Sequence, residues 1–187
     1  IIPRETVATL MRICKAKGTR PIRWRSSPTH VEFSTPNMLL TVRLVDGSFP
    51  PWRHVVPDRN ASKTVVHCGG SELRDVIERT KPVWAKAAPR LEFFIHPEKG
   101  RLVLVAAGHK NKTTCRVELD VAIRGGKLRT SFNPQYILAA LAAIGGTQVE
   151  LGLLDAMSPV RMCDVDDPDG VTAVVMPQRL VVMPQRL

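Results

Sequence analysis

Aromatic residues make up only 5% of this 187-residue sequence, so aliphatic side chains must fill most of any core. Long apolar runs are also absent. No stretch approaches the roughly 20 uninterrupted apolar residues that span a bilayer, and no charged and then apolar leader precedes a cleavage site. We therefore expect a soluble, cytoplasmic protein, whose apolar fraction of 44% is enough for a buried core.

Motifs for catalysis and for metal binding are lacking as well. The five histidines show neither metal-ligand spacing nor a nucleophile motif, and the sequence contains no glycine-rich phosphate loop. The acidic segment 164–170 resembles a calcium loop, but no Glu closes it and Val165 stands at its first ligand position. We interpret it as a polar hairpin. The sequence therefore predicts a protein that is not an enzyme and holds no metal or cofactor.

The sequence also lacks closely spaced cysteines. The four cysteines lie far apart in apolar or strand-like surroundings: Cys14, Cys68, Cys115 and Cys163. Disulfides are typical of oxidising compartments, and structural zinc sites need paired ligands such as two cysteines separated by two residues. We therefore interpret all four cysteines as reduced core residues.

Acidic residues are the scarcer charged type. The sequence has 17 Asp and Glu residues against 27 Lys and Arg residues, which gives a formal net charge of +10. The excess is uneven, because residues 1–57 hold nine basic side chains and three acidic ones. A polyanionic partner explains this excess, and so does a well-solvated basic surface. Charge alone favours the two explanations about equally.

Three stretches of about 60 residues share one plan, an amphipathic helix followed by three short strands. Each helix is indicated by apolar residues that recur at helical spacing. In the first stretch these residues are Val7, Leu10, Met11 and Cys14, and in the second they are Leu73, Val76, Ile77 and Thr80. In the second stretch Ser71 is the expected N-cap, and Pro82 is expected to stop or kink the helix. In the third, Asn133 and Pro134 begin an alanine-rich helix over 135–144 that ends at Gly145.

Alternating patterns and turn residues predict the strands. The expected ranges are 21–26, 30–35 and 38–45, then 63–68, 91–96, 101–106 and 113–121, and finally 148–154, 158–163 and 171–176. Antiparallel strands with helices on one side make an α+β unit, and two such units packed together make one domain. The sequence thus predicts an α+β protein of three units, or about one and a half domains.

Two segments carry a resemblance to a known family. They are LVDGSFPPWRHVVP at 44–57 and VVMPQRL at 174–180. Both resemble the bacterial sliding clamp, the β subunit of DNA polymerase III, in its C-terminal half only. The resemblance implies a DNA-clamp fold, in which residues 1–60 match the C-terminal half of the middle domain and residues 61–180 match the C-terminal domain. The clamp's first domain, and the first half of its second, have no counterpart in this sequence.

The resemblance also implies a groove that captures peptides from polymerases and repair proteins. The positions that match groove residues are Pro50, His54, Val55, Asn133, Tyr136, Met157, Pro159, Val174, Val175, Met176, Pro177 and Arg179. The family commonly has Arg where His54 stands, and a small hydroxyl residue where Pro159 stands. Without the resemblance, 174–180 would be interpreted as a C-terminal edge strand and 44–57 as a linker.

In the family, helices that line the ring contact DNA phosphates without reading bases. Arg4, Arg12 and Lys15 match such DNA-facing positions, whereas the helix over 135–144 carries no charge. The partners that the resemblance implies are duplex DNA, clamp-binding polymerase and repair proteins, the clamp loader and further clamp subunits. Two alternatives remain open: a stand-alone peptide-binding module, and a basic nucleic-acid-binding protein that forms no ring.

The heptapeptide VVMPQRL occurs a second time at 181–187, beyond the position where the family ends. Gln185 and Leu187 weakly resemble the Gln and Leu of clamp-binding peptides. A tethered segment can reach an effective concentration of about a millimolar. We predict that this second copy partly occludes the groove, and that its deletion tightens peptide binding.

Overall fold

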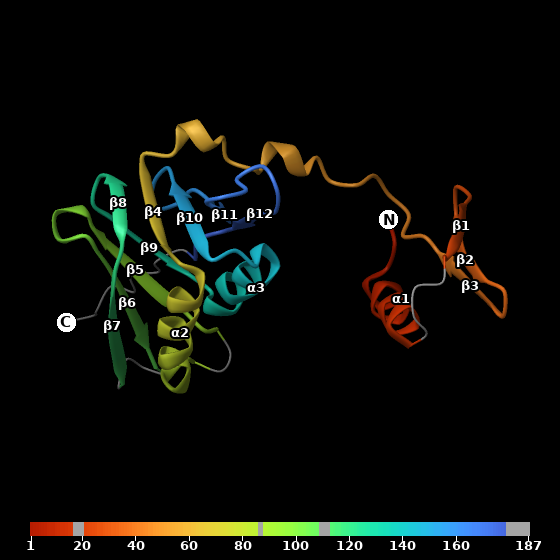
Figure 1. Ribbon diagram of the computed structural model, residues 1–187, viewed down its shortest axis with the longest axis horizontal. Coiled ribbons are helices and arrows are strands. Elements are labelled where there is room, and N and C mark those ends of the chain that lie inside the picture. The colour runs from red at the N-terminus through yellow and green to blue at the C-terminus, as the bar shows by residue number, and fades with distance from the viewer. Residues whose placement is uncertain (17–20, 86–87, 109–112, 179–187) are drawn as a thin grey trace, which may run out of the picture. The chain divides into compact units, whose positions relative to one another are not determined.

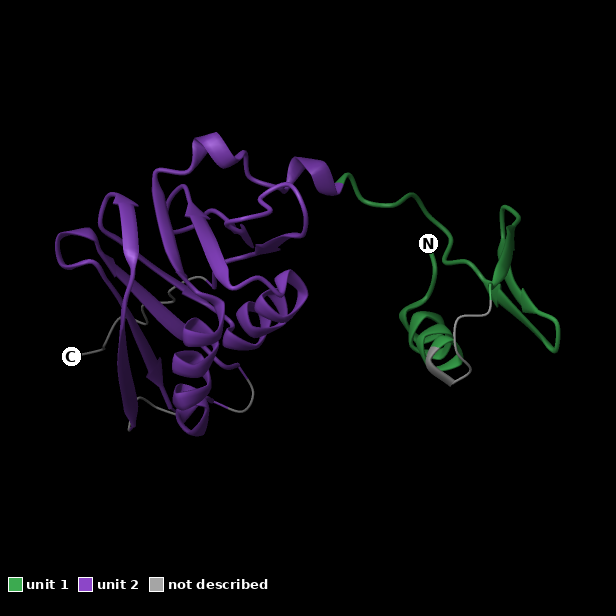
Figure 2. Cartoon of the chain, viewed as in Figure 1, with its two compact units in different colours: residues 1–51 green, residues 52–187 purple. Residues whose placement is uncertain are grey.

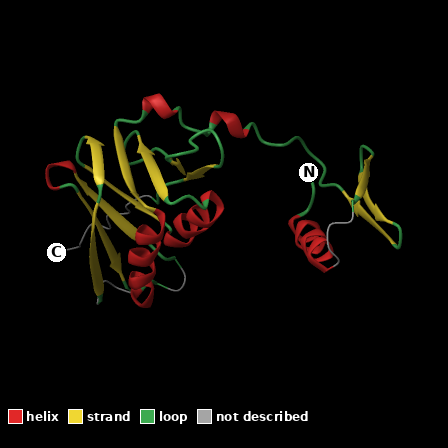
Figure 3. Cartoon of the chain, viewed as in Figure 1, coloured by secondary structure: helices red, strands yellow, loops and turns green. Residues whose placement is uncertain are grey.

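A computed structural model of the chain describes residues 1–16, 21–85, 88–108 and 113–178, without the side chains of residues 15 and 16. The chain divides into two compact units, unit 1 at residues 1–51 and unit 2 at residues 52–187 (Figure 2). Helices and antiparallel strands occur in both (Figure 3). No helix within the described ranges is long and apolar enough to cross a membrane.

Unit 1 consists of one helix and one antiparallel sheet. The helix α1 (Arg4–Ala16) precedes β1 (Arg23–Ser26), β2 (His30–Thr35) and β3 (Met38–Arg43), which pair in that order. The predicted elements are therefore present, but the predicted burial is not. On the apolar stripe of α1, Val7 is 45% exposed, Met11 is 55% exposed and Cys14 is exposed as well. One helix and one three-stranded sheet cannot enclose all the apolar side chains of α1, and Cys14 is not a core residue.

Unit 2 begins with two short 3-10 helices, η1 (Trp52–His54) and η2 (Arg59–Ala61). Its first half then contains β4 (Thr64–Gly69), α2 (Gly70–Thr80), η3 (Lys81–Val83), β5 (Leu91–His96), η4 (Pro97–Lys99), β6 (Arg101–Ala107), β7 (Thr114–Asp120) and β8 (Ala122–Gly125). Its second half contains β9 (Leu128–Phe132), α3 (Pro134–Ile144), β10 (Gln148–Leu153), β11 (Val160–Asp164) and β12 (Thr172–Val175). The strands β8 and β9 were not predicted.

The two halves of unit 2 exchange their first strands. One sheet has the order β12-β11-β10-β4-β8, so β4 of the first half pairs with β10 of the second. The other sheet has the order β7-β6-β5-β9, so β9 of the second half pairs with β5 of the first. The helices α2 and α3 pack against each other and against these sheets (Figure 1). One core of buried aliphatic residues, with Phe93 and Phe132 in edge-to-face contact, joins both halves.

The helices of unit 2 follow their sequence signals, with one exception. Asn133 accepts a hydrogen bond from the backbone N–H of Gln135 at 2.9 Å, and Gly145 ends α3 with a positive φ of 67°. The exception is the predicted cap of α2, because the helix already begins at Gly70 and Ser71 lies inside its first turn. A Cβ atom at Gly70 would lie 2.8 Å from the backbone oxygen of Gly146. The chain therefore needs glycine where the helix starts, and a capping side chain at Ser71 has no role.

Candidate peptide-binding surface

The segment that follows β12 is fastened to β9. The backbone N–H of Gln178 donates to the carbonyl oxygen of Ser131 at 2.7 Å, and the Ser131 hydroxyl donates to the Gln178 carbonyl oxygen at 2.7 Å. The Gln178 side chain also donates to the carbonyl oxygen of Pro89 at 3.3 Å. These bonds hold the backbone directly after Pro177, while the side chain of Met176 remains 60% exposed.

A tight turn between β10 and β11 presents a second methionine. The Asp155 carboxylate accepts hydrogen bonds from the backbone N–H groups of Met157 at 2.8 Å and Ser158 at 2.7 Å, and from the Ser158 hydroxyl at 2.9 Å. These bonds, with that of Met157 the largest cause, lower the pKa of Asp155. The carbonyl oxygen of Ala156 accepts a hydrogen bond from Thr130 of β9 at 3.0 Å. Met157 is 55% exposed on this fixed turn.

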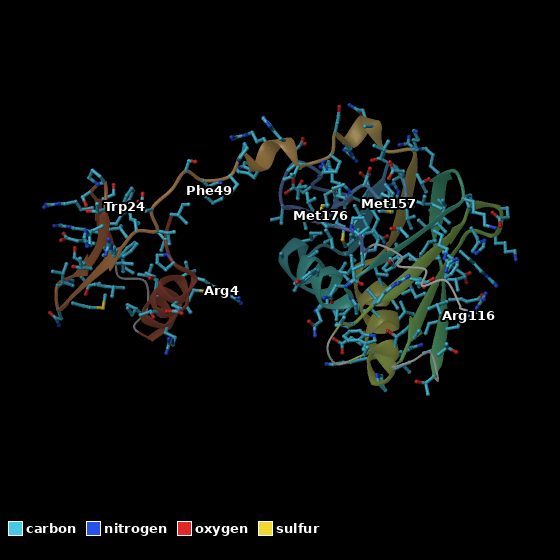
Figure 4. The ribbon with its side chains drawn as sticks, turned by 180° about the vertical axis from the view of Figure 1, so that it is seen from behind. Arg4, Trp24, Phe49, Arg116, Met157 and Met176 are labelled. Atoms are coloured by element: carbon cyan, nitrogen blue, oxygen red, sulfur yellow. The ribbon has the colours of Figure 1, made fainter. Side chains whose placement is uncertain are left out.

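The start of α3 completes the surface, because it directly follows β9. Asn133 caps the helix, and Tyr136 in its first turn is 62% exposed. In the adjoining strands Val160 pairs with Val175, which brings Pro159 close to Met176. We call the following seven residues the C-terminal surface: Asn133, Tyr136, Met157, Pro159, Val174, Met176 and Pro177. Figure 4 shows Met157 and Met176 on neighbouring segments of unit 2.

The other residues of the predicted groove have different positions. Val175 is 5% exposed and belongs to the core, so its side chain supports the C-terminal surface from below and is not part of it. His54 and Val55 are exposed at the end of η1, ahead of the first strand of unit 2. Pro50 belongs to unit 1 and is therefore described separately from the C-terminal surface. Arg179 lies outside the described residues, as does the second heptapeptide at 181–187.

The predicted DNA-facing residues lie on α1 of unit 1. Arg4 and Arg12 are exposed, and the Arg12 side chain donates to the carbonyl oxygen of Ala8 at 3.4 Å. Lys15 is in the same helix, although its side chain is outside the description. The helix α3 has no charged residue, as the sequence predicts.

Sequence reasoning missed a buried charge network in the five-stranded sheet that also contains β12. Glu150 of β10 is 6% exposed and lies close to the side chains of Arg59, His67 and Arg161. Hydrogen bonds from Arg59, followed by those from His67, lower the pKa of Glu150 against the opposing effect of burial. In the sequence, the network is visible only as one charged residue inside the apolar run 149–154. A charged residue at an exposed position of an alternating strand gives the same pattern, so the sequence does not distinguish a buried Glu150 from an exposed one.

Comparison with known proteins identifies the family. Residues 53–179 match the family model of the DNA polymerase III beta subunit, C-terminal domain. The chain belongs to the DNA polymerase III β-subunit family. This confirms the resemblance that 44–57 and 174–180 indicated. The matched range begins inside η1 and contains all the other described strands and helices of unit 2, together with every residue of the C-terminal surface.

Two curated relatives are the β sliding clamps of Caulobacter vibrioides and Escherichia coli. They are 28% and 27% identical over 180 residues, which cover 96% of this chain and 46% and 47% of the relatives. The crystal structure of the DNA polymerase III subunit β from Pseudomonas aeruginosa superposes with a TM-score of 0.86 at 27% identity, covering 96% of this chain and 47% of that one. The chain thus has a clamp-like α+β fold, and it spans about half the length of these relatives.

Proposed function

We propose that this chain works as part of a sliding clamp that tethers DNA polymerase III and repair proteins to duplex DNA. In this proposal residues 61–180 are the C-terminal domain of the clamp, and residues 1–60 are the C-terminal half of its middle domain. The protein acts in the cytoplasm without catalysis, and its further partners are the clamp loader and other clamp subunits. The observation that carries the proposal is the C-terminal surface, because a family match alone does not identify a binding site.

The chemistry of the C-terminal surface suits short apolar peptides. Met157 and Met176 have flexible, polarisable side chains that adapt to different partners. The hydrogen bonds of Asp155 and Gln178 fix the backbone beneath both methionines, so little ordering is required when a peptide binds. A short peptide with one or two apolar anchors buries little area, and we expect a dissociation constant in the micromolar range, or about 8 kcal/mol.

Two solved relatives are described with a bound ligand. One is the Caulobacter crescentus β sliding clamp with polyethylene glycol bound to its putative β-motif tethering region, with a TM-score of 0.85 and 28% identity over 96% of this chain and 46% of that one. The other is the Pseudomonas aeruginosa clamp bound to griselimycin, with a TM-score of 0.84 and 27% identity. We propose that griselimycin and clamp-binding peptides compete for the C-terminal surface of this chain.

Titration of a fluorescent peptide, copied from a clamp-binding segment of a DNA polymerase, tests the proposal. We expect Met176→Ala to weaken binding by ~1 to 3 kcal/mol, since it removes an apolar contact, whereas Arg12→Ala leaves the dissociation constant unchanged. Griselimycin should displace the peptide from the parent chain. Equal losses in both variants would show that the peptide binds by general electrostatic attraction, and no displacement would show that griselimycin and the peptide bind at different sites.

The basic residues support a second activity, sequence-independent binding to DNA phosphates. Arg4 and Arg12 are exposed on one helix, and unit 1 carries most of the positive excess of residues 1–57. The logarithm of such a binding constant falls linearly with the logarithm of the salt concentration, because binding releases counterions from the DNA. Salt-sensitive binding to short linear duplexes, without retention on nicked circular DNA, would favour the alternative of a basic nucleic-acid-binding protein over a clamp that encircles DNA.

A further inference from the structure

The five-stranded sheet has a second face, opposite the core, that carries both charged groups and a residue of the C-terminal surface. Directly paired residues of neighbouring antiparallel strands point to the same face. One row across the sheet contains Val174, Arg161 and Gly152. The next row contains Glu150 and its partner His67. Val174 therefore stands on the same face as the Glu150 network.

Glu150 is the centre of this network. Its carboxylate accepts two hydrogen bonds from the Arg59 guanidinium, from Nε to Oε1 at 3.0 Å and from Nη2 to Oε2 at 2.9 Å. Nε2 of His67 lies 3.1 Å from Oε2, and Nη1 of Arg161 lies 3.6 Å from Oε1. The Glu150 and Arg161 side chains are only 7% and 9% exposed, so a loss of the carboxylate leaves a buried guanidinium without its counter-charge.

Through Arg59, the carboxylate holds the segment 52–63 against the sheet. The backbone N–H of Lys63 donates to the carbonyl oxygen of Leu153 at 2.9 Å. Ser62 covers Gly152 so closely that a Cβ atom on Gly152 would lie 2.6 Å from the Ser62 hydroxyl oxygen. Arg59 is the side chain of this segment that bonds the sheet by two charge-assisted hydrogen bonds, and it follows Val55 by only four positions. The direction in which 52–55 leaves the sheet therefore depends on this contact.

Through Arg161, the same carboxylate supports the strand that leads to Met176. Nη2 of Arg161 donates to the carbonyl oxygen of Pro168 at 2.8 Å and to the Thr172 hydroxyl at 3.3 Å. These contacts fasten the loop 165–171 and the first residue of β12. Arg161 also stands directly opposite Val174 in the pairing of β11 with β12.

We propose that Glu150 is a positioning residue for peptide binding, which holds the segment 52–63 and the strand β12 in one fixed arrangement. The inference rests on the proposed function, because it assigns Glu150 a role in the peptide-binding activity. Glu150 is 6% exposed, so in this proposal it acts through the two segments that it holds and not by contact with the peptide. Its carboxylate joins two segments that are far apart in the sequence, one with His54 and Val55 and the other with Val174 and Met176.

The test compares two matched substitutions, Glu150→Gln and Glu92→Gln. Glu92 also accepts hydrogen bonds from two arginines, Arg90 and Arg129, but it lies on the four-stranded sheet, and among the described residues it forms no hydrogen bond or ion pair with 52–63 or β12. We expect Glu150→Gln to weaken binding of the fluorescent peptide and of griselimycin at least about five-fold, a size common for residues that act on a site through neighbours. Glu92→Gln should stay within about two-fold of the parent.

A second parent chain, which carries Val55→Ala, distinguishes a positioning role of Glu150 from a simple loss of stability. If Glu150 acts through the segment 52–63, Glu150→Gln should have much less effect on affinity in a chain that already carries Val55→Ala, although it lowers the melting temperature equally in both. Arg59→Gln is the milder second variant, since the Arg59 side chain is 44% exposed and its loss leaves Arg161 beside the carboxylate. It should reproduce the affinity loss at a smaller cost in melting temperature.

The failure of this inference can be distinguished from the failure of the proposed function. A parent chain that binds neither peptide nor griselimycin overturns the proposed function. Amide hydrogen exchange then decides the positioning role, which predicts faster exchange over 52–63 and 172–178 in Glu150→Gln than in Glu92→Gln. The inference is wrong if a folded Glu150→Gln chain binds and exchanges like Glu92→Gln, or if its affinity loss is the same with and without Val55→Ala.

Discussion

Units 1 and 2 contain the same kind of element, a helix followed by three antiparallel strands, yet they bury their apolar residues to very different extents. In unit 2 two such sets of elements enclose one core that contains residues of both sheets and both helices. In unit 1, among the residues that the structure describes, Val31 is the one apolar residue that is fully buried. Trp24, Leu39 and Phe49 are 69%, 66% and 67% exposed.

The difference shows that a helix with three strands is half of a folding unit. The first half of unit 2 contributes β4 and β8 to the sheet of the second half, the second contributes β9 to the sheet of the first, and the two helices pack together. Unit 1 has one helix and one sheet, so its apolar face remains open to solvent. Small structures bury a smaller fraction of their surface than large ones, and about 50 residues is close to the limit for independent stability. We therefore expect unit 2 to provide most of the stability of the chain.

The largest expected difference concerns thiol reactivity. Cys14 of unit 1 is exposed, whereas Cys68 and Cys163 of unit 2 are buried, and burial raises the pKa of Cys68 to about 12. Buried thiols react only when the structure opens, so we expect Cys14 to be alkylated at least about a thousand times faster than Cys68. Mass spectrometry after timed maleimide labelling measures this ratio. The rates of the two thiols in the guanidinium-unfolded chain serve as the reference. Similar labelling rates for Cys14 and Cys68 in the native chain would contradict the proposed difference between the units.

A pair of phenylalanine substitutions compares the units in free energy. Phe93 is 1% exposed and contacts the ring of Phe132 edge to face at a centroid distance of 5.2 Å. We expect Phe93→Ala to lower the free energy of unfolding by about 3 to 5 kcal/mol, because it leaves a cavity in the core. Phe49→Ala in unit 1 should change it by less than about 0.5 kcal/mol. Urea unfolding followed by circular dichroism measures both, and a large loss in Phe49→Ala would show that unit 1 packs more tightly than its exposure indicates.

Acid should weaken unit 2 through Glu150. Its pKa is lowered from the ordinary glutamate value of 4.5, first by Arg59 and then by His67, with Arg161 also close to the carboxylate. A carboxylate with a lowered pKa contributes stability above its unfolded-state value, and this contribution is lost as the pH falls through the folded-state value. We expect the difference in melting temperature between parent and Glu150→Gln to be constant above pH about 5 and to shrink below pH about 4.5. A difference that does not change with pH would show that the charge of Glu150 has no part in it.

The smallest effect on stability is expected for the open face of unit 1. Replacement of both Met11 and Trp24 by glutamine should change the free energy of unfolding by less than about 0.5 kcal/mol, since both side chains are more than half exposed. The same variant should self-associate less, because exposed apolar patches favour association. Sedimentation velocity and urea unfolding on the same samples measure both effects. A loss of 2 kcal/mol or more would show that these side chains form part of a core.

Much of the fold could be predicted from local patterns. The stripe of α2 and the caps of α3 are decided by residues within a few positions of each other, and both predicted helices are present. The strands β8 and β9 were missed, because Ala122–Gly125 is too short for a clear alternation and Thr130 and Ser131 are buried polar residues. The exchange of β4 and β9 between sheets depends on long-range pairing, which a local pattern does not contain.

The resemblance supplied the candidate site as a list of residues, and the contacts that hold these residues in place could not be predicted from it. The resemblance indicated Met157 and Met176, whose neighbourhood follows from the bonds of Thr130 and Ser131 to segments far along the chain. The Glu150 network was not predictable, because Arg59 and Glu150 lie 91 positions apart and neither belongs to a recognisable motif. The resemblance assigns Val175 to the groove by its position in the sequence alone. In the structure, side chains alternate along β12, and that of Val175 points into the core.

The strand exchange in unit 2 has a consequence for synthesis of the protein on the ribosome. Val66 of β4 pairs with Leu151 of β10, so the strand emerges about 85 residues before its partner. At ordinary rates of translation the delay is on the order of ten seconds. During this time the sequence Thr-Val-Val-His-Cys-Gly of β4 is an unpaired strand of high β propensity. We therefore expect nascent chains that stall between β4 and β10 to bind chaperones and to aggregate more than chains that stall after β10.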